Sequence, residues 1–348
     1  MVRWGLIGGS DIAATRMIPA MRAIGQTPVA VSSSSAQRAE LFADRHDIAS
    51  SCRDVDDLLA RDDVDAVYIS SVNRLHAEHT IAAAAAGKHV LCEKPVALDV
   101  TDAADMVAAC ERAGVVFAVN HHLPAHTANT VIRQIIAAGA VGEIKSIRAF
   151  FAYELAPRLH GWRLTDPSVG GPILDLVPHV ASVVNKIAGT PESATAIKVR
   201  QGNWDVEVPD GAELPEDTCM AVVRYSGDVL CQIHVGWATP YARNGLEING
   251  TAGSVVATGV LWADPIGTVT VVNADGRHDV AIERHVDPYQ ATLASFERAV
   301  STGEPPMVTG REGALALALT LAVRRAAAGG TVERVEAVGT SSRAGART

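Results

Sequence analysis

The sequence predicts an α/β fold in two domains: a doubly wound parallel sheet, then an α+β domain with a large, mostly antiparallel open sheet. Its 348 residues exceed what one hydrophobic core usually organises. Residues 1–122 alternate short β-branched runs with longer alanine-rich amphipathic stretches, whereas residues 123–338 carry a long series of strand-like segments. The Ser, Arg and Gly composition of residues 339–348 predicts a disordered tail.

The first domain contains five predicted strands. They cover Trp4–Ile7, Pro28–Val31, Ala66–Ser70, His89–Cys92 and Val115–Val119. The stretches between them are long enough for helical crossovers, so we expect parallel strands that are buried on both faces. This arrangement is a Rossmann fold, which binds nucleotides at the carboxyl ends of its strands.

The second domain contains helices and a run of hairpins. The expected helices are Thr127–Ala138, Ile173–Ile187, Pro288–Val300 and Gly310–Ala328. The expected strands are Ile144–Tyr153, Thr195–Arg200, Cys219–Tyr225, Val229–Val235, Leu246–Asn249, Ser254–Thr258 and Thr268–Val272. Short turns rich in Gly and Asp, such as Tyr225–Asp228 and Asn273–Gly276, predict the hairpins.

Composition narrows the class of partner. A net charge of -9 and the lack of any Lys/Arg run argue against nucleic acid or an anionic membrane. The N-terminus has no signal-peptide pattern, and the apolar run at 81–87 is too short to span a bilayer. The five cysteines contain no CxxC pair, so they predict neither disulfides nor a metal site, and they suit a reducing cytoplasm. We expect a cytoplasmic monomer or homo-oligomer with a small-molecule partner.

A dinucleotide site is expected where the first strand ends. The strand runs into a GxSxxA turn in which Gly8 permits the tight bend, Ser10 lets the backbone approach a pyrophosphate, and Ala13 allows close helix packing. The candidate contacts in this turn are Gly8, Gly9, Ser10, Asp11 and Ile12. Alone the motif is a weak signal, and a glycine-serine turn without chemical consequence is the alternative.

The end of the second strand predicts the type of cofactor. An NAD-selective site has a carboxylate there to bind the ribose 2′-hydroxyl, but this chain has Ser32 and Ser33, with Arg38 nearby. Hydroxyl and guanidinium donors suit a 2′-phosphate. We therefore expect NADP(H), with NAD(H) as the second choice. The alternative is that Arg38 is only a solvated helix residue.

Polar residues follow the other strands at the same edge. Glu93 and Lys94 end the fourth strand, where Lys94 could donate to a substrate oxygen and burial beside the nicotinamide would lower its pKa. The alternative is a structural Glu93–Lys94 ion pair. The further cofactor-edge candidates are Ser70, Ser71, Asn73, His76 and Asn120. For His76 the alternative is a satisfied histidine at a helix start.

His121 and His122 follow Asn120 directly and are expected to line the pocket. Because adjacent side chains on a strand face opposite ways, these two histidines make a poor metal site, and we expect no metal.

The second domain offers an acid–base pair. Asp175 and His179 lie four residues apart, which on a helix brings both side chains to one face, so that the carboxylate can orient an imidazole that exchanges a proton with a substrate hydroxyl. Pro178 must then fall in the first turn or kink the helix. A plain surface pair is the alternative.

The loop before the helix of Asp175 and His179 carries hydrogen-bond donors and one aromatic side chain, which suit the binding of a hydroxylated ring. The candidate substrate contacts there are His160, Trp162 and Arg163. The alternative is that Trp162 belongs to the core and the arginine is solvated.

Together these motifs resemble the glucose-fructose oxidoreductase and inositol dehydrogenase family over nearly the whole chain. The resemblance is carried by the Gly-Leu-Ile-Gly start, Asn73 with His76, the Glu-Lys-Pro motif at 93–95, Gly170-Gly with Asp175 and His179, and Gly250-Thr-Ala-Gly253. It implies hydride transfer between a nicotinamide and a ring carbonyl or secondary alcohol of a sugar-like substrate. Lys94 and His179 would handle the proton, with Asp175 as their partner. A non-catalytic NADP-binding regulator is the alternative from another class.

Overall fold

The computed structural model describes residues 1–207 and 211–339. The predicted disordered tail therefore lies, apart from Gly339, outside the described residues. The chain divides into two compact units. Unit 1 contains Met1–Ala125 and Val286–Leu317 with Val338 and Gly339, and unit 2 contains His126–His285 and Ala318–Ala337. The nucleotide and substrate roles of the two predicted domains stay predictions.

Unit 1 is built on a parallel sheet with the strand order β3-β2-β1-β4-β5-β6. The strands are β1 (Arg3–Ile7), β2 (Thr27–Ser32), β3 (Ser50–Ser51), β4 (Ala66–Ile69), β5 (His89–Cys92) and β6 (Phe117–Val119). Every neighbouring pair runs parallel. This order is that of the dinucleotide-binding fold, so the predicted Rossmann sheet is confirmed.

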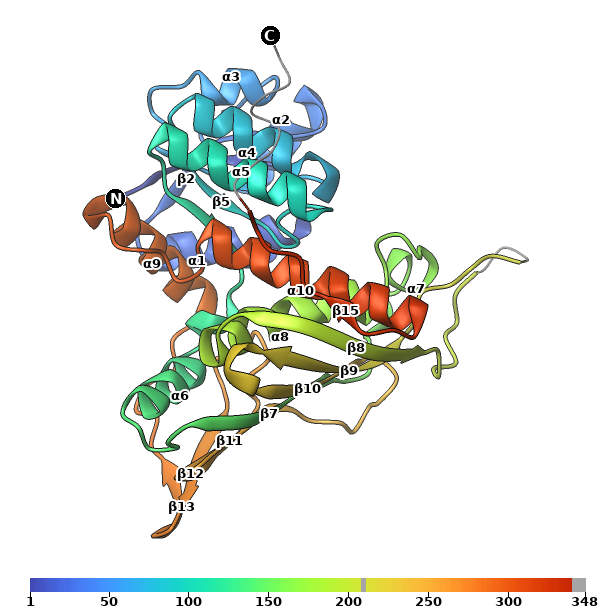
Figure 1. The fold of residues 1–348 in the computed structure, drawn as a ribbon. Coiled ribbons are helices and arrows are strands. Elements are labelled where there is room, and N and C mark those ends of the chain that lie inside the picture. Colours follow the sequence, from blue (N-terminus) through green and yellow to red (C-terminus); the bar gives the residue numbers. More distant parts are fainter. Residues whose placement is uncertain (208–210, 340–348) are drawn as a thin grey trace. The chain divides into compact units, whose positions relative to one another are not determined.

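Helices cover the sheet of unit 1 (Figure 1). They are η1 (Ala13–Met17), α1 (Ile18–Ala23), α2 (Ala36–Arg45), α3 (Val55–Leu59), η2 (Asn73–Leu75), α4 (His76–Ala85), α5 (Val100–Ala113), η3 (Leu123–Ala125) and α9 (Pro288–Thr302). Helix α4 packs on β4, β5 and α5, whereas α1 packs on β2 and α9. Helix α10 (Gly310–Gly329) begins in unit 1 and ends in unit 2.

The sequence assigned α9 to the second domain, but the structure groups it with unit 1. The reason is a long-range apolar contact. The ring of Phe296 in α9 lies 5.0 Å from that of Trp4 in β1, and both side chains are fully buried. Trp4 Nε1 also donates to Gln26 Oε1 at 2.7 Å. Burial of two such aromatic side chains binds α9 to the first sheet.

Unit 2 is built on a nine-stranded sheet with the order β14-β13-β12-β11-β7-β10-β9-β8-β15. Its strands are β7 (Ile144–Ala152), β8 (Pro191–Val199), β9 (Thr218–Tyr225), β10 (Leu230–Gly236), β11 (Asn244–Gly250), β12 (Gly253–Thr258), β13 (Thr268–Asn273), β14 (Gly276–Val280) and β15 (Glu333–Arg334). Among the described strands of this second sheet, only β7 and β10 pair in parallel. The predicted mostly antiparallel sheet is confirmed.

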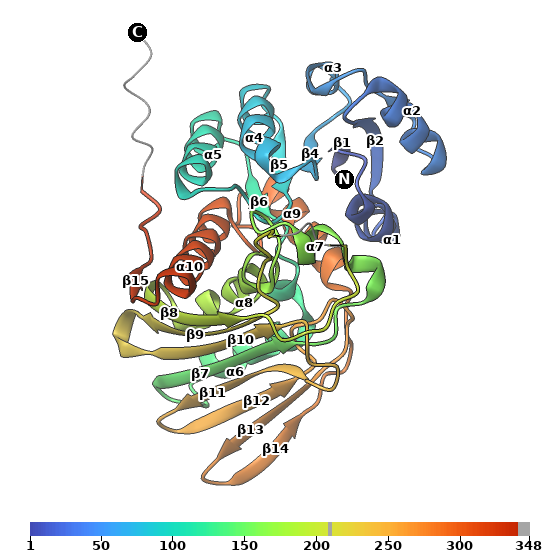
Figure 2. The same cartoon turned by 90° about the vertical axis from the view of Figure 1, so that its right-hand side faces the viewer.

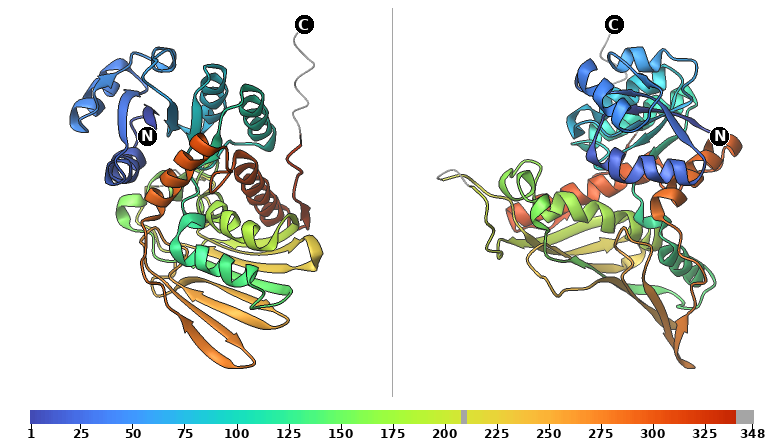
Figure 3. Two further views of the ribbon diagram at one scale, coloured as in Figure 1. Left: turned by 90° about the vertical axis from the view of Figure 1, so that its left-hand side faces the viewer. Right: turned by 180° about the vertical axis from the view of Figure 1, so that it is seen from behind.

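Helices α6 (Thr127–Ala137) and α8 (Pro172–Ala188) lie on one face of this sheet (Figures 2 and 3). The helices of unit 2 are α6 (Thr127–Ala137), η4 (Pro157–Leu159), α7 (Trp162–Thr165) and α8 (Pro172–Ala188), with the turn η5 (Ser226–Asp228). Helix α8 packs on β7, β9 and β10, and α6 packs on α8. Pro178 lies in the interior of α8 and not in its first turn, because the helix already begins at Pro172. No helix in the described ranges is long and apolar enough to cross a membrane.

Candidate active site

The turn after β1 depends on glycine. Gly8 has φ +111°, and a Cβ there would lie 2.7 Å from the carbonyl carbon of Ser70 and the nitrogen of Ser71. Glycine therefore lets this turn lie against the end of β4. Ser10 Oγ accepts from the backbone nitrogen of Ala13 at 3.1 Å and donates to Ser70 Oγ at 2.8 Å. The structure thus joins residues that the sequence placed separately after two strands.

The neighbouring turn residues are open to a ligand. Gly9 lies against α2, since a Cβ there would be 2.9 Å from the Phe42 ring. Gly9 and Ile12 are half-buried, and Asp11 is exposed where the helical run begins. The backbone of this turn can therefore approach a phosphate at a helix N-terminus.

The serines after β2 differ in accessibility. Ser32 is fully buried, and its hydroxyl has no hydrogen-bond partner among the described residues. Ser33 is half-buried and Arg38 is exposed. Ser35 begins α2 by accepting a hydrogen bond from the backbone nitrogen of Arg38 at 3.3 Å. Of the three residues expected at the 2′-phosphate, Ser33 and Arg38 have side chains that a ligand can reach.

Glu93 holds the start of the Lys94 turn. Its buried carboxylate accepts from the Tyr68 hydroxyl at 2.6 Å, from Asn120 Nδ2 at 2.5 Å and from the backbone nitrogen of Lys94 at 3.2 Å. Burial and the nearby Glu93 charge raise the pKa of Tyr68 well above its ordinary value, so the phenol stays a donor. Tyr68 was not among the residues expected at this edge of the sheet. A tyrosine within an otherwise aliphatic buried strand could have indicated a hydrogen bond from its hydroxyl to a buried acceptor.

His76 binds backbone on both sides of its ring. Its Nδ1 lies 2.9 Å from the Pro95 carbonyl oxygen and its Nε2 lies 3.0 Å from that of Ser71. Burial lowers the pKa of this histidine. A neutral imidazole carries one N–H, so His76 donates to one of these two carbonyl oxygens. Its role as a cofactor contact stays a prediction. His76 ties the turn after Lys94 to the loop in which Asn73 begins η2.

The two adjacent histidines after β6 have different neighbours. His121 is buried, and its pKa is lowered to about 3, first by burial and then by the charge of Lys94. His122 stacks on Tyr289 with the ring centroids 4.3 Å apart. That His121 and His122 line the pocket stays a prediction.

Two glycines shape the loop that joins α7 to α8 in unit 2. A Cβ at Gly170 would lie 2.7 Å from the carbonyl oxygens of Trp162 and Arg163. Gly171 has φ +85°, and a Cβ there would meet the Glu216 carboxylate, which accepts from the backbone nitrogen of Ile173 at 3.3 Å. Glycine at position 170 lets the chain lie against the α7 backbone, and glycine at position 171 makes room for the Glu216 carboxylate at the start of α8.

That packing brings Arg163 to Asp175. Arg163 Nε donates to Asp175 Oδ2 at 3.1 Å, and its guanidinium carbon lies 4.4 Å from the Trp162 ring centroid. Trp162 is 45% exposed, so it is not a core residue. The loop therefore presents an aromatic face, a cation and a carboxylate together, which suits a hydroxylated ring.

Asp175 and His179 both lie on α8 at the spacing that places side chains on one helix face. His179 is buried, with its ring 6.5 Å from that of Phe151. His160 is half-buried, and its Nε2 lies 3.1 Å from the Leu155 carbonyl oxygen. Its ring also meets Trp204 at 5.3 Å, a contact that sequence reasoning missed because these residues are far apart in the chain.

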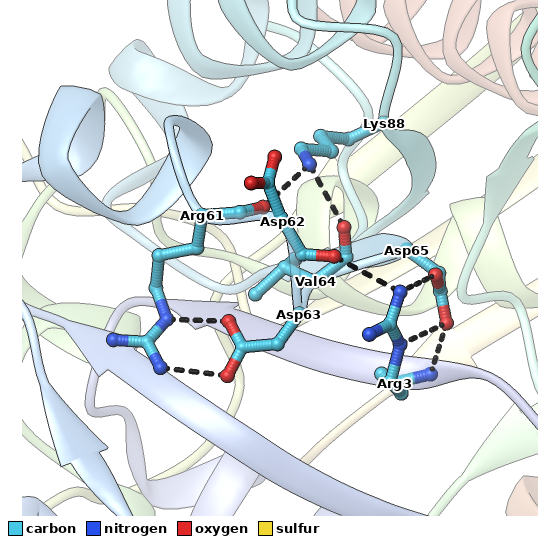
Figure 4. A network of polar contacts seen from close by, with 7 residues as sticks. All are labelled: Arg3, Arg61, Asp62, Asp63, Val64, Asp65 and Lys88. Carbon is cyan, nitrogen blue, oxygen red and sulfur yellow. Dashed lines mark hydrogen bonds and ion pairs between the residues drawn. The ribbon is translucent and has the colours of Figure 1, made fainter.

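Charged residues gather at the opposite, amino-terminal edge of the unit 1 sheet (Figure 4). The Arg3 guanidinium donates to both oxygens of Asp65 at 2.6 and 3.0 Å, and Lys88 Nζ donates to the carbonyl oxygens of Arg61 and Val64 at 2.7 and 2.9 Å. A cavity of about 680 Å³ opens here. Because parallel sheets bind nucleotides at their carboxyl edge and these charged groups already bind each other, the network is structural.

The structure therefore assembles one group of candidate residues in each unit. Unit 1 assembles the glycine turn, Ser33 with Arg38, and the Glu93–Lys94 turn, and unit 2 assembles Trp162, Arg163 and Asp175. That Lys94 and His179 act on one substrate stays a prediction.

Comparison with known proteins gives a consistent result for both units. A family model described as oxidoreductase family, NAD-binding Rossmann fold, matches residues 2–121, and a model of the GFO/IDH/MocA C-terminal domain matches residues 130–256. The chain is 41% identical over 338 residues to 1,5-anhydro-D-fructose reductase of Ensifer adhaerens, covering 97% of this chain and 99% of that protein.

Further relatives are more distant. D-xylose 1-dehydrogenase (NADP(+)) 2 of Haloferax volcanii is 28% identical and covers 89% of this chain and 92% of that protein. The solved structure of levoglucosan dehydrogenase in complex with NADH gives a TM-score of 0.83 at 23% identity, over 96% of this chain and 99% of that one. This last likeness concerns the fold.

The buried His121 predicts a pH dependence of stability. Unfolded, the ring takes up a proton below about pH 6.5, whereas folded it stays neutral down to about pH 3. The contribution of His121 to the free energy of unfolding is therefore greatest above the unfolded-state pKa of about 6.5. It decreases as the pH falls below that value, by up to about 1.4 kcal/mol per pH unit. We expect His121→Gln to flatten the decline in unfolding free energy between about pH 6.5 and 5, measured by urea titration. The exposed His278→Gln is the control, and parallel profiles for wild type and His121→Gln would contradict the assignment.

Proposed function

The chain belongs to the GFO/IDH/MocA oxidoreductase family and contains its NAD-binding Rossmann domain, and from this premise we propose that it transfers hydride between NADP(H) and a ring ketone or secondary alcohol of a sugar-like substrate. We propose 1,5-anhydro-D-fructose, reduced to 1,5-anhydro-D-mannitol, as the substrate, because the reductase of Ensifer adhaerens is similar over almost the full chain. The observation that carries the chemistry is Lys94 at the carboxyl end of β5, beside the fixed Glu93 carboxylate.

The residues of unit 1 fit a phosphorylated dinucleotide. Because Gly8 has no side chain, the turn can lie against the backbone of Ser70 and Ser71 just after β4. The backbone nitrogens of this turn can then approach a pyrophosphate. Beyond β2, Ser33 and the exposed Arg38 can donate to a 2′-phosphate, and no carboxylate stands at the serine run to repel it. When bound, the nicotinamide supplies or accepts the hydride.

In the reductive direction the substrate carbon gains the hydride and its oxygen gains a proton. Lys94 and His179 polarise that oxygen and supply the proton, and Asp175 orients them. Arg163 holds the Asp175 carboxylate in place, while Trp162, His160 and His121 contact the ring. Oxidation of the alcohol uses the same residues in reverse.

A second candidate is an NADP-linked sugar dehydrogenase working in the oxidative direction. The similarity to D-xylose 1-dehydrogenase (NADP(+)) 2 favours it. We also propose that the protein works in the cytoplasm, because all five cysteines are buried free thiols that a reducing compartment preserves.

A substrate panel separates these functions. Ketoses, anhydrosugars and inositols are each tested for NADPH oxidation and for NADP reduction at one enzyme concentration. We expect the highest kcat/KM for NADPH oxidation with 1,5-anhydro-D-fructose. A preference for aldose oxidation would favour the dehydrogenase, and cofactor binding without turnover of any compound would favour a regulatory protein.

Replacement of either proton-handling residue should lower turnover. We expect Lys94→Met and His179→Gln each to reduce kcat roughly 10²- to 10⁴-fold, since general acid–base catalysis contributes that much, while the Kd for NADPH changes little. Stopped-flow kinetics and a fluorescence titration of NADPH measure the two quantities. Lys145→Met, at the exposed amino end of β7, is the matched control. Wild-type turnover in both variants would refute the roles.

Arg38 should set the preference for NADP. We expect Arg38→Ala to raise the KM for NADPH about 10- to 100-fold, because a hydrogen bond to a charged group is worth about 1.5–3 kcal/mol, and to leave the KM for NADH nearly unchanged. Arg45→Ala, at the other end of α2, controls for the loss of an exposed helix charge. Equal changes with both cofactors would show that Arg38 does not read the 2′-phosphate.

A further inference from the structure

The parallel pair of unit 2 carries an aromatic residue after each of its strands. Strands β7 and β10 stay in parallel register up to Ala152 and Gly236, and Tyr153 and Trp237 come next. The backbone nitrogen of Tyr153 donates to the Gly236 carbonyl oxygen at 3.0 Å, which fixes where the tyrosine leaves the sheet. Both aromatic residues therefore leave the sheet at the same edge.

The ring of Tyr153 lies among aromatic side chains. It is T-shaped against the half-buried Trp262 at 4.9 Å and lies 5.5 Å from Phe151, whose ring also faces that of His179 at 6.5 Å. Burial, and after it the charge of Asp175, raises the pKa of Tyr153 to about 12, so the phenol stays a neutral donor. The Trp237 side chain and the Arg163 charge act on this pKa in the opposite direction.

This combination differs from a purely structural aromatic contact. Apolar packing alone would be served by phenylalanine, whereas a tyrosine supplies a hydroxyl donor as well. Tyr153 and His179 both lie against the Phe151 ring, and β7 packs on α8, the helix that carries Asp175. Sugars present hydroxyls around the ring edge and C–H groups on the ring faces, which match a polar pair and an aromatic face respectively.

We propose that Tyr153 is a specificity-determining residue whose phenol donates a hydrogen bond to a ring hydroxyl of the sugar-like substrate, beside Asp175 and Arg163. Trp262 holds the phenol ring in this orientation. The inference rests on the proposed function for the class of substrate, and it adds a contact outside the predicted proton-handling residues.

The test compares Tyr153→Phe with Tyr241→Phe in the full chain. Both changes remove only a phenolic oxygen, and Tyr241 is 96% exposed, so it controls for that loss. Each variant is assayed with NADPH on 1,5-anhydro-D-fructose and on an analogue that lacks one ring hydroxyl. We expect Tyr153→Phe to lower kcat/KM about 10-fold on the full substrate, mainly through KM, and to change it little on the analogue whose missing hydroxyl is the partner.

Equal losses on the substrate and on every deoxy analogue would overturn the proposal, as would no loss at all. The wild-type protein gives an independent check, because it should discriminate against one deoxy analogue and Tyr153→Phe should lose that discrimination. The proposal is also overturned if the wild-type protein has the same kcat/KM on the full substrate and on every deoxy analogue.

A binding measurement separates this proposal from the proposed function. 1,5-Anhydro-D-glucitol, a saturated polyol, is titrated into each protein while tryptophan fluorescence is followed. Affinity reduced about 10-fold in Tyr153→Phe but not in Tyr241→Phe supports the contact even where no ketone is reduced. Equal affinity in wild type and both variants overturns it even where reduction is observed.

Discussion

The buried carboxylate of Glu93 organises the carboxyl edge of the parallel sheet. A phenol from β4, an amide from the end of β6 and the next backbone nitrogen all donate to it. Loss of one donor would leave a buried charged oxygen short of a partner, at a cost of about 1–3 kcal/mol or more. Since Lys94 follows directly, the same hydrogen bonds that satisfy Glu93 set the position from which Lys94 leaves the sheet.

In unit 2, close backbone packing positions the candidate residues Arg163 and Asp175. Gly170 lies against the carbonyl oxygens of the α7 turn just before α8 begins, and Arg163 of that turn binds Asp175 of α8. The ion pair is mostly screened from water, so removal of one partner would leave the other poorly compensated. In each unit, hydrogen bonds and close backbone contacts fix the loop on which the candidate catalytic or binding residues lie.

Most of the fold could be predicted from local patterns, because buried parallel strands are apolar and the crossovers are amphipathic. The strands that escaped prediction are β3, β14 and β15. Strands β3 and β15 have only two residues each. Strand β14 is almost entirely exposed, so it is a strand because it pairs with β13 and not because it buries apolar side chains. Helix α9 was assigned to the wrong unit because its contact with Trp4 spans nearly the whole chain.

Residues whose relationships are local could be identified from the chain alone. The strand ends located Gly8, Ser33 and Lys94, and the helical spacing located Asp175 with His179. The partners of these groups depend on the tertiary fold. Tyr68 reaches Glu93, and Arg163 reaches Asp175, across separations that no periodicity encodes. The physical reason is that a repeat in the chain reports which face a side chain occupies, whereas the neighbour it meets depends on how separate elements pack.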